Sequence, residues 1–300
     1  MRFNRMLGLA FCIFSVAGCG GAPIANIAPP PAHSARFGHV FIVVEENTNY
    51  GNVVGNPAMS YLNGLANQYG LATNYFANAH PSIPNYFMLT TGQTQTFLDP
   101  LTPETFTPSG DNVVHELVTS GKTWKSYAED LPSVGYIGGD SGKYAVRHNP
   151  LAYMAEVQND PGQKQNLVPF TQFAADLSAG SLPDYSFIVP NLCDDAHDCS
   201  LSIADGWLKL NIDPLIQSSV FQKDGLLIIV FDEADLNDFT AGGGHVAAVI
   251  VSPLAKRSYK SVAFYQHQSV LRLSLEGLGV TKLPGESATA PVMWEFFNVP

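Results

Sequence analysis

Hydrophobic and polar positions along this chain divide it into short apolar runs and longer segments with helical periodicity. The clearest apolar runs are HVFIVV at 39–44, LLIIVF at 226–231 and VAAVIV at 246–251. Continuous apolar runs of this length are typical of strands that are buried on both faces. Weaker patterns of the same kind predict further strands at 71–76, 123–127 and 184–189.

Helical patterns lie between these runs. They predict helices at 60–69, 85–91, 111–120, 170–178, 203–220 and 266–278. Residues 128–169 are rich in Gly, Asn and Pro and form a long irregular segment, which in a compact domain is usually functional. The alternation of strands and helices indicates an open α/β sheet, which builds its ligand site where the strands end.

The N-terminus has the pattern of a targeting segment. Arg2 and Arg5 precede an apolar run at 6–16 that ends in Val-Ala-Gly-Cys19, which is typical of a bacterial lipoprotein signal. We therefore expect a signal peptide at 1–18, a lipid-bearing Cys19, a flexible tether at 19–35 and one catalytic domain at 36–300. The chain would then be exported and lipid-anchored to a bacterial membrane, in the periplasm or at the cell surface. An ordinary secretory signal that is cleaved nearby is the alternative.

Charge narrows the choice of partners. The formal net charge of -11 argues against nucleic acid, because phosphate contacts would need a basic face. Part of the negative charge is clustered at 45–46, 194–198 and 232–235. Clustered carboxylates repel one another unless a cation neutralises them, although any single run could be a solvated loop.

The domain keeps only two cysteines, Cys193 and Cys199, if the first cysteine is removed with the leader and Cys19 carries lipid. Export places this pair in an oxidising compartment, which favours a disulfide that would hold Asp195 and His197 in one geometry. A disulfide that closes so short a loop contributes roughly 2 kcal/mol to the free energy of unfolding. A zinc site made of both cysteines and His197 is the competing interpretation.

Chemically useful side chains follow or precede the apolar runs: Glu46-Asn47, Ser82, Asp232-Glu233 and His245. Carboxylates, an amide, a hydroxyl and imidazoles at such positions indicate a metal-assisted hydrolase. Ser82 lies just before a predicted helix, where backbone N–H groups favour an anion. It could also serve only as a helix cap.

Several motifs together resemble the bacterial and fungal phosphoesterase family, which contains acid phosphatases and phospholipases C. They are ENTNYGNVVG at 46–55, HPSIPNY at 80–86, RHNP at 147–150, PNLCDDAHDC at 190–199 and FDE at 231–233. The resemblance extends from about 39 to 253 and departs from the family pattern at Asn49, where a Ser is usual. It implies a single-domain, three-layer α/β sandwich of the alkaline-phosphatase type, with a mostly parallel central sheet and helices on both faces.

The resemblance also implies roles for individual residues. It makes Glu46, Asn47, Asp232 and Glu233 the ligands of a divalent metal. Ser82 becomes the nucleophile, because its Ser-Ile-Pro-Asn context is similar to the Thr-Phe-Pro-Asn motif of nucleotide pyrophosphatases in the same superfamily.

The remaining polar residues suit phosphate chemistry. We expect Asn85, His148 and His245 to bind phosphate and His197 to act as a catalytic proton donor; the three histidines could also form a second cation site. Oxygen ligands favour Mg, Ca or Mn, whereas histidine participation favours Zn. His267 is expected at the surface.

The leading functional hypothesis is a metal-dependent phosphomonoesterase of acid-phosphatase type that acts on small phosphate esters. A phospholipase C-type phosphodiesterase that cuts lipid headgroups is the second. A non-catalytic, cation-binding surface lipoprotein is the third.

Overall fold

An eight-stranded sheet forms the centre of the protein, which a computed structural model describes over residues 37–298. The strands follow one another in the order β4-β3-β5-β1-β6-β7-β2-β8. They are β1 (His39–Glu45), β2 (Gly70–Ala72), β3 (Trp124–Ala128), β4 (Leu167–Pro169), β5 (Tyr185–Val189), β6 (Gly225–Phe231), β7 (Ala248–Val251) and β8 (Tyr259–Ser261).

The sheet is mostly parallel. Strand β1 lies between β5 and β6 and is parallel to both, with Glu45 opposite Phe231. Strand β7 is antiparallel to both β6 and β2. Because β1 and β6 end side by side, the residues that follow them, Glu46 and Asp232, leave the sheet at the same edge; the Asp232 N–H donates to the Glu45 carbonyl at 2.9 Å.

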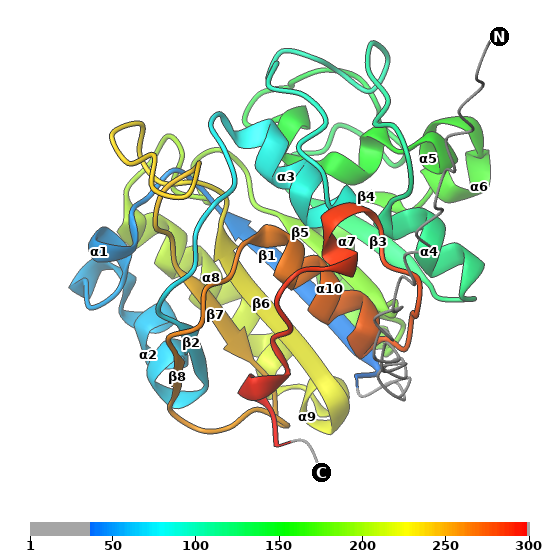
Figure 1. Cartoon of the computed structure of the whole chain (residues 1–300). Coiled ribbons are helices and arrows are strands. Elements are labelled where there is room, and N and C mark those ends of the chain that lie inside the picture. Colours follow the sequence, from blue (N-terminus) through cyan, green and yellow to red (C-terminus); the bar gives the residue numbers. More distant parts are fainter. Residues whose placement is uncertain (1–36, 299–300) are drawn as a thin grey trace, which may run out of the picture. The chain divides into compact units, whose positions relative to one another are not determined.

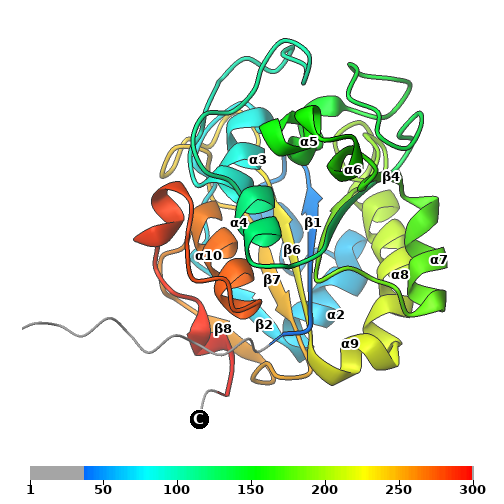
Figure 2. The same ribbon diagram turned by 90° about the vertical axis from the view of Figure 1, so that its right-hand side faces the viewer.

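Helices cover both faces of the sheet (Figures 1 and 2). Helices α3, α4 and α10 pack together on one face, and α2, α7, α8 and α9 lie on the other. The α-helices are α1 (Tyr50–Val53), α2 (Ser60–Gln68), α3 (Ser82–Thr91), α4 (Val113–Thr119), α5 (Ala155–Asn159), α6 (Pro161–Lys164), α7 (Thr171–Ala179), α8 (Leu201–Gln217), α9 (Ser219–Asp224) and α10 (His267–Gly277). Short 3₁₀ turns occupy Pro57–Met59, Val146–His148, Pro150–Tyr153, Gly285–Ala288 and Trp294–Phe296. The predicted three-layer α/β sandwich is confirmed.

The central strands are apolar because they have no solvent face. Every residue of β6 is buried, and in β1 only His39 is partly exposed. Phe41 packs against rings of one helical layer, Phe173 of α7 and Phe221 of α9. Burial of this kind, at about 25 cal/mol per Å² of apolar area, holds the polar ends of these strands in place.

Some predicted boundaries are wrong. The helix expected at 203–220 breaks at Ser218, whose hydroxyl accepts a hydrogen bond from the Phe221 N–H at 3.2 Å and caps α9. Strand β8 was missed because Tyr-Lys-Ser offers no apolar run. The segment 128–169, expected to be irregular, contains short helices and β4.

The predicted signal peptide at 1–18, Cys19 and the tether at 19–35 lie outside the described residues. Among residues 37–298, no helix combines the length and the apolar character that crossing a bilayer requires.

Candidate active site

The turn after β1 brings together the first pair of site residues. Asn47 adopts a left-handed backbone with φ of 52°, a conformation that Asn tolerates better than most residues. This turn directs the Asn47 N–H to Asp232 Oδ1 at 3.1 Å. The Asn47 side-chain amide donates to Glu46 Oε2 at 3.2 Å. Residues from both ends of the sequence therefore meet at this edge of the sheet.

Ser82 begins α3 and is buried between two carboxylates. Its Oγ lies 3.2 Å from Glu46 Oε2 and 3.2 Å from Glu233 Oε1. A hydroxyl has a single hydrogen, so only one of these carboxylates can accept it at a time. The other carboxyl group must carry a proton, or a cation must neutralise it.

The loop before α3 is fixed by Asn85. Its side-chain oxygen accepts hydrogen bonds from the N–H groups of Asn78 and Ala79, at 3.0 and 3.1 Å. Its amide nitrogen donates to the carbonyls of Ala79 and Pro81, at 2.7 and 3.2 Å. The structure thus gives Asn85 a positioning role, and the predicted phosphate contact would require breaking these bonds.

His80 holds the second carboxylate. Its Nδ1 lies 2.5 Å from Glu233 Oε2, and its Nε2 lies 2.9 Å from the Asp238 carbonyl. The glycine-rich turn beside it packs against this loop, where a Cβ on Gly243 would lie 2.4 Å from the Ala79 carbonyl oxygen. The sequence motif contained His80, but no role was predicted for it.

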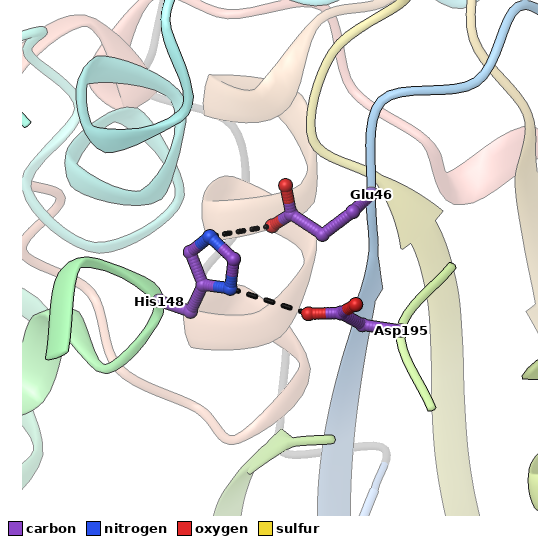
Figure 3. A group of neighbouring side chains, drawn as sticks. All are labelled: Glu46, His148 and Asp195. Carbon is purple, nitrogen blue, oxygen red and sulfur yellow. Dashed lines mark ion pairs between the residues drawn. The ribbon is translucent and has the colours of Figure 1, made fainter. Parts of the chain in front are cut away.

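The second carboxylate oxygen of Glu46, Oε1, has partners of its own. The Tyr86 hydroxyl donates to Glu46 Oε1, and His148 Nε2 lies 3.3 Å from the same oxygen. On its other side, His148 Nδ1 lies 3.3 Å from Asp195 Oδ2 (Figure 3). His148 was predicted to bind phosphate, but its side chain is 1% exposed and lies behind Glu46.

Burial raises the pKa of each acid in this group. The pKa of Glu46 lies well above its usual value, mainly because of burial and also because of Asp232 and Asp195. Burial raises the pKa of Asp232 to about 7. Burial and the neighbouring Asp232 together raise the pKa of Glu233 to about 9. Such a group needs protons or a cation to be stable at neutral pH.

The donor set fits a hard divalent cation. Buried oxygens of Glu46, Ser82 and Glu233 face one another, and Asp232 Oδ2 has no hydrogen-bond partner among the described residues. Unpaired buried carboxylate oxygens are costly unless a ligand satisfies them. Oxygen donors of this kind suit Mg²⁺, Ca²⁺ or Mn²⁺.

A cavity of about 610 Å³ opens above Ser82. Asn47, Ser82 and Glu233 lie at its base, and Asp99, Arg147 and His197 lie on its wall. Among the described residues that line the cavity, Arg147 is the only Lys or Arg, and its Nη2 lies 3.2 Å from His197 Nε2. The cavity therefore places a fixed positive charge on its wall and a hydroxyl at its base.

Two predicted histidine positions differ from expectation. His245 does not line the cavity; it stacks on Tyr50 and Phe76 with ring centroids 4.2 and 4.8 Å apart. The expectation that His267 lies at the surface was wrong. His267 is buried. Its ring extends from α10 to the residue after β6, where its Nε2 lies 2.6 Å from the Asp232 carbonyl.

The predicted disulfide between Cys193 and Cys199 is confirmed, with Cα atoms 4.7 Å apart. The alternative zinc site is wrong, since both sulfurs are in this bond. The enclosed loop carries Asp195, which is buried, and His197, whose side chain is 29% exposed. One small loop therefore contributes to both the interior and the wall of the site.

Comparison with known proteins agrees with this geometry. Residues 56–278 match the phosphoesterase family. The chain belongs to that family, as its motifs predicted. A probable acid phosphatase of Kluyveromyces lactis is 32% identical over 79% of this chain and 57% of its own length. A phosphatidylinositol-3-phosphatase of Mycobacterium tuberculosis is 35% identical over 78% of this chain and 75% of its own length.

This phosphoesterase chain spans about half the length of the fungal acid phosphatases that it matches: 57% of the Kluyveromyces lactis protein and 52% of a phosphate-repressible acid phosphatase of Penicillium chrysogenum. Among solved structures, a protein of the alkaline phosphatase superfamily from Vibrio parahaemolyticus has a TM-score of 0.57 and 16% identity. That match covers 89% of this chain and 73% of the other. It shows a shared fold.

Proposed function

We propose that this phosphoesterase is a metal-dependent phosphomonoesterase of acid-phosphatase type with Ser82 as its nucleophile. The observation that carries the proposal is the Ser82 hydroxyl, which lies between buried Glu46 and Glu233 at the base of a cavity whose wall bears Arg147. The names of the curated relatives, acid phosphatases and a phosphatidylinositol-3-phosphatase, support phosphate esters as substrates.

Glu46, Asn47, Asp232 and Glu233 would hold the cation. When bound, it would lower the pKa of the Ser82 hydroxyl and offset the charge on the phosphoryl oxygens. Oxygen donors dominate this set, so we expect Mg²⁺, Ca²⁺ or Mn²⁺ to be bound in preference to Zn²⁺.

In the proposed reaction Ser82 Oγ attacks phosphorus in line, and its proton passes to Glu233, whose Oε1 it already contacts. Arg147 binds the phosphoryl oxygens from the cavity wall. The ester P–O bond breaks, and His197 protonates the leaving alkoxide. His197, turned toward Asp198 through Nδ1 at 2.7 Å, then takes a proton from the water that attacks phosphoserine. The bond between phosphorus and Ser82 Oγ breaks, Glu233 returns the proton to Oγ, and phosphate is released.

An assay of turnover without metal and then with each metal in turn tests this proposal. Chelator-treated protein should not release p-nitrophenol from p-nitrophenyl phosphate, and adding one of the four metals should restore turnover. Ser82→Ala should reduce kcat by at least about 10³-fold, and mass spectrometry of quenched wild-type protein should find phosphate on Ser82. Ser202→Ala, at an exposed position of α8, is the matched control.

Full turnover by Ser82→Ala would remove the serine from the mechanism and leave water as the nucleophile. Cation binding without turnover on any ester would instead support the non-catalytic lipoprotein. Cleavage of p-nitrophenyl phosphorylcholine but not p-nitrophenyl phosphate would support the phospholipase C-type diesterase.

A second candidate, hydrolysis of phosphate carried on a lipid, is favoured by an apolar rim around the cavity. We define this rim as Phe97, Leu98, Leu236 and Phe239, whose exposed fractions are 56%, 60%, 69% and 65%. Leu236 lines the cavity, and Phe97-Leu98 precede Asp99, which also lines it. Exposed apolar side chains grouped at a cavity mouth are typical of a surface that contacts an apolar ligand.

The lipid candidate predicts a substrate-dependent effect of Phe97→Ser/Leu98→Ser. This double variant should lose phosphate release from phosphorylated lipid in vesicles and retain turnover of p-nitrophenyl phosphate. Equal effects on both substrates would exclude a role of the rim in lipid binding.

We further propose that the chain is exported and anchored through Cys19, because a basic, apolar leader precedes Val-Ala-Gly-Cys19. Cys19→Ser should release the protein from the membrane fraction. Unchanged processing and fractionation of that variant would contradict the anchor.

A further inference from the structure

We propose that Asp195 and His148 form a positioning pair that holds the metal ligand Glu46 in its binding orientation. This inference rests on the cation site of the proposed function. The sequence predicted no role for Asp195 and a direct phosphate contact for His148.

The His148 ring bridges two carboxylates (Figure 3). Its Nε2 lies 3.3 Å from Glu46 Oε1, and its Nδ1 lies 3.3 Å from Asp195 Oδ2. The two ring nitrogens point in different directions, one toward each carboxylate. The three side chains therefore form a carboxylate–imidazole–carboxylate chain.

Burial makes this chain rigid. The side chains of His148, Glu46 and Asp195 are 1%, 0% and 1% exposed. Tyr86 stacks on the imidazole with ring centroids 5.0 Å apart and an interplanar angle of 6°. The Tyr86 hydroxyl also donates to Glu46 Oε1. The ring cannot turn without losing this stacking.

Asp195 also holds Glu46 through the main chain. Its carbonyl accepts the Glu46 N–H at 2.8 Å, and its Oδ1 accepts the His197 N–H at 2.8 Å. The loop that contains Asp195 is closed by the disulfide between Cys193 and Cys199. One residue of a stapled loop thus fixes both the backbone and, through His148, the side chain of the metal ligand.

This arrangement assigns the two Glu46 oxygens to different tasks. Oε1 is taken by Tyr86 and His148, whereas Oε2 faces Ser82 and Asn47. Glu46 is therefore set to bind the cation through Oε2 alone. Without the pair, the carboxylate is free to rotate, and loss of such outer partners lowers metal affinity by about 10–100-fold.

Calorimetric titration of the metal-free full chain with Mn²⁺ tests the pair without measuring activity. Asp195→Asn and His148→Gln should each weaken Mn²⁺ binding by about 10–100-fold. Asp198→Asn is the matched control for metal affinity, because this exposed carboxylate of the same loop faces His197 and not the chain to Glu46. It should bind Mn²⁺ as the wild type does.

The double variant distinguishes a chain from two separate effects. If Asp195 acts through His148, the Asp195→Asn/His148→Gln variant should bind Mn²⁺ no more weakly than the worse single variant. Thermal unfolding of the metal-free proteins provides a second readout. A merely structural role would lower Tm equally with and without Mn²⁺, whereas a positioning role should mainly reduce the Tm increase that Mn²⁺ causes.

Wild-type affinity in both single variants, or fully additive losses in the double variant, would overturn the pair. If Asp195→Asn does not fold, His148→Gln against Asp198→Asn decides the question in the same way. If the wild type binds neither Mn²⁺ nor Mg²⁺, the cation site of the proposed function fails and this inference fails with it. Normal wild-type binding with unaffected variants would refute this inference alone.

Discussion

Two adjacent glutamates at the end of β1 lie on opposite faces of the sheet and have opposite surroundings. Both are 0% exposed. Glu46 contacts Ser82, Tyr86, Asn47 and His148, whereas neither oxygen of Glu45 has a hydrogen-bond partner among the described residues.

The difference shows how this fold treats a buried acid. Burial, together with Asp195, Asp205 and Asp194, raises the pKa of Glu45 well above its usual value, which favours the neutral form of this acid. Glu46 has partners on both oxygens and lies beside further carboxylates, a setting that a cation can stabilise. Burial alone therefore does not mark a functional acid; its partners do.

The largest expected effect is on Glu46. Glu46→Gln should lower both Mn²⁺ affinity and kcat by more than about 100-fold, since loss of an outer partner alone costs about 10–100-fold. Titration calorimetry and p-nitrophenyl phosphate turnover measure the two effects. Retained Mn²⁺ affinity in this variant would contradict the proposed role of Glu46.

The second largest expected effect is on the loop closed by the disulfide between Cys193 and Cys199. Replacing Cys193 and Cys199 by Ser removes a cross-link that contributes about 2 kcal/mol in the chain-entropy model. Because this loop holds Asp195, we also expect weaker Mn²⁺ binding. Urea unfolding and calorimetry measure the two changes, and unchanged affinity would show that Asp195 keeps its place without the disulfide.

Replacing Glu45 should stabilise the protein and leave turnover intact, the reverse of the result expected for Glu46. Glu45→Met removes an unpaired buried carboxyl group of similar volume, which should raise the free energy of unfolding by about 1–3 kcal/mol at about pH 8. The raised pKa means that the wild type loses stability as the pH increases, so the gain should shrink toward about pH 5. We expect near-normal kcat, and a large loss of turnover would place Glu45 in the catalytic machinery.

The smallest expected effect concerns Glu129, which follows β3 on the same side as Glu45. Burial raises its pKa from 4.5 to about 7, although the Asn191 N–H and the Trp207 indole donate to it. Its contribution to stability is complete below about pH 4.5 and is lost as the pH rises through about 7. Glu129→Gln should therefore flatten the decline in unfolding free energy between about pH 5 and about pH 8, as measured by urea titration.

Much of the fold could be predicted from the sequence because the central strands are apolar on both faces. The runs at 39–44 and 226–231 correspond to β1 and β6, and their adjacency follows from the parallel sheet. Strand β8 and the short strand β4 could not be predicted, because neighbours and not local composition hold these three-residue strands in the sheet.

The site was partly predictable for a similar reason. Glu46, Ser82 and Glu233 do meet, and acids at strand ends carried that signal. The bridging by His148 could not be foreseen, since the direction of a side chain in a loop depends on tertiary contacts. Arg147, its neighbour in the same motif, lines the cavity but was given no role.

His267 has a practical consequence for anyone who wishes to shorten this protein. Its ring joins the Tyr75 hydroxyl, 3.0 Å from Nδ1, to the Asp232 carbonyl, and it comes from the first turn of α10. A fragment that stops after β8 would leave this carbonyl and a tyrosine hydroxyl exposed behind the catalytic edge. Any crystallisation fragment should therefore retain α10 through Gly277. This glycine ends the helix and packs so closely on Phe37 that a Cβ there would clash with the Phe37 ring.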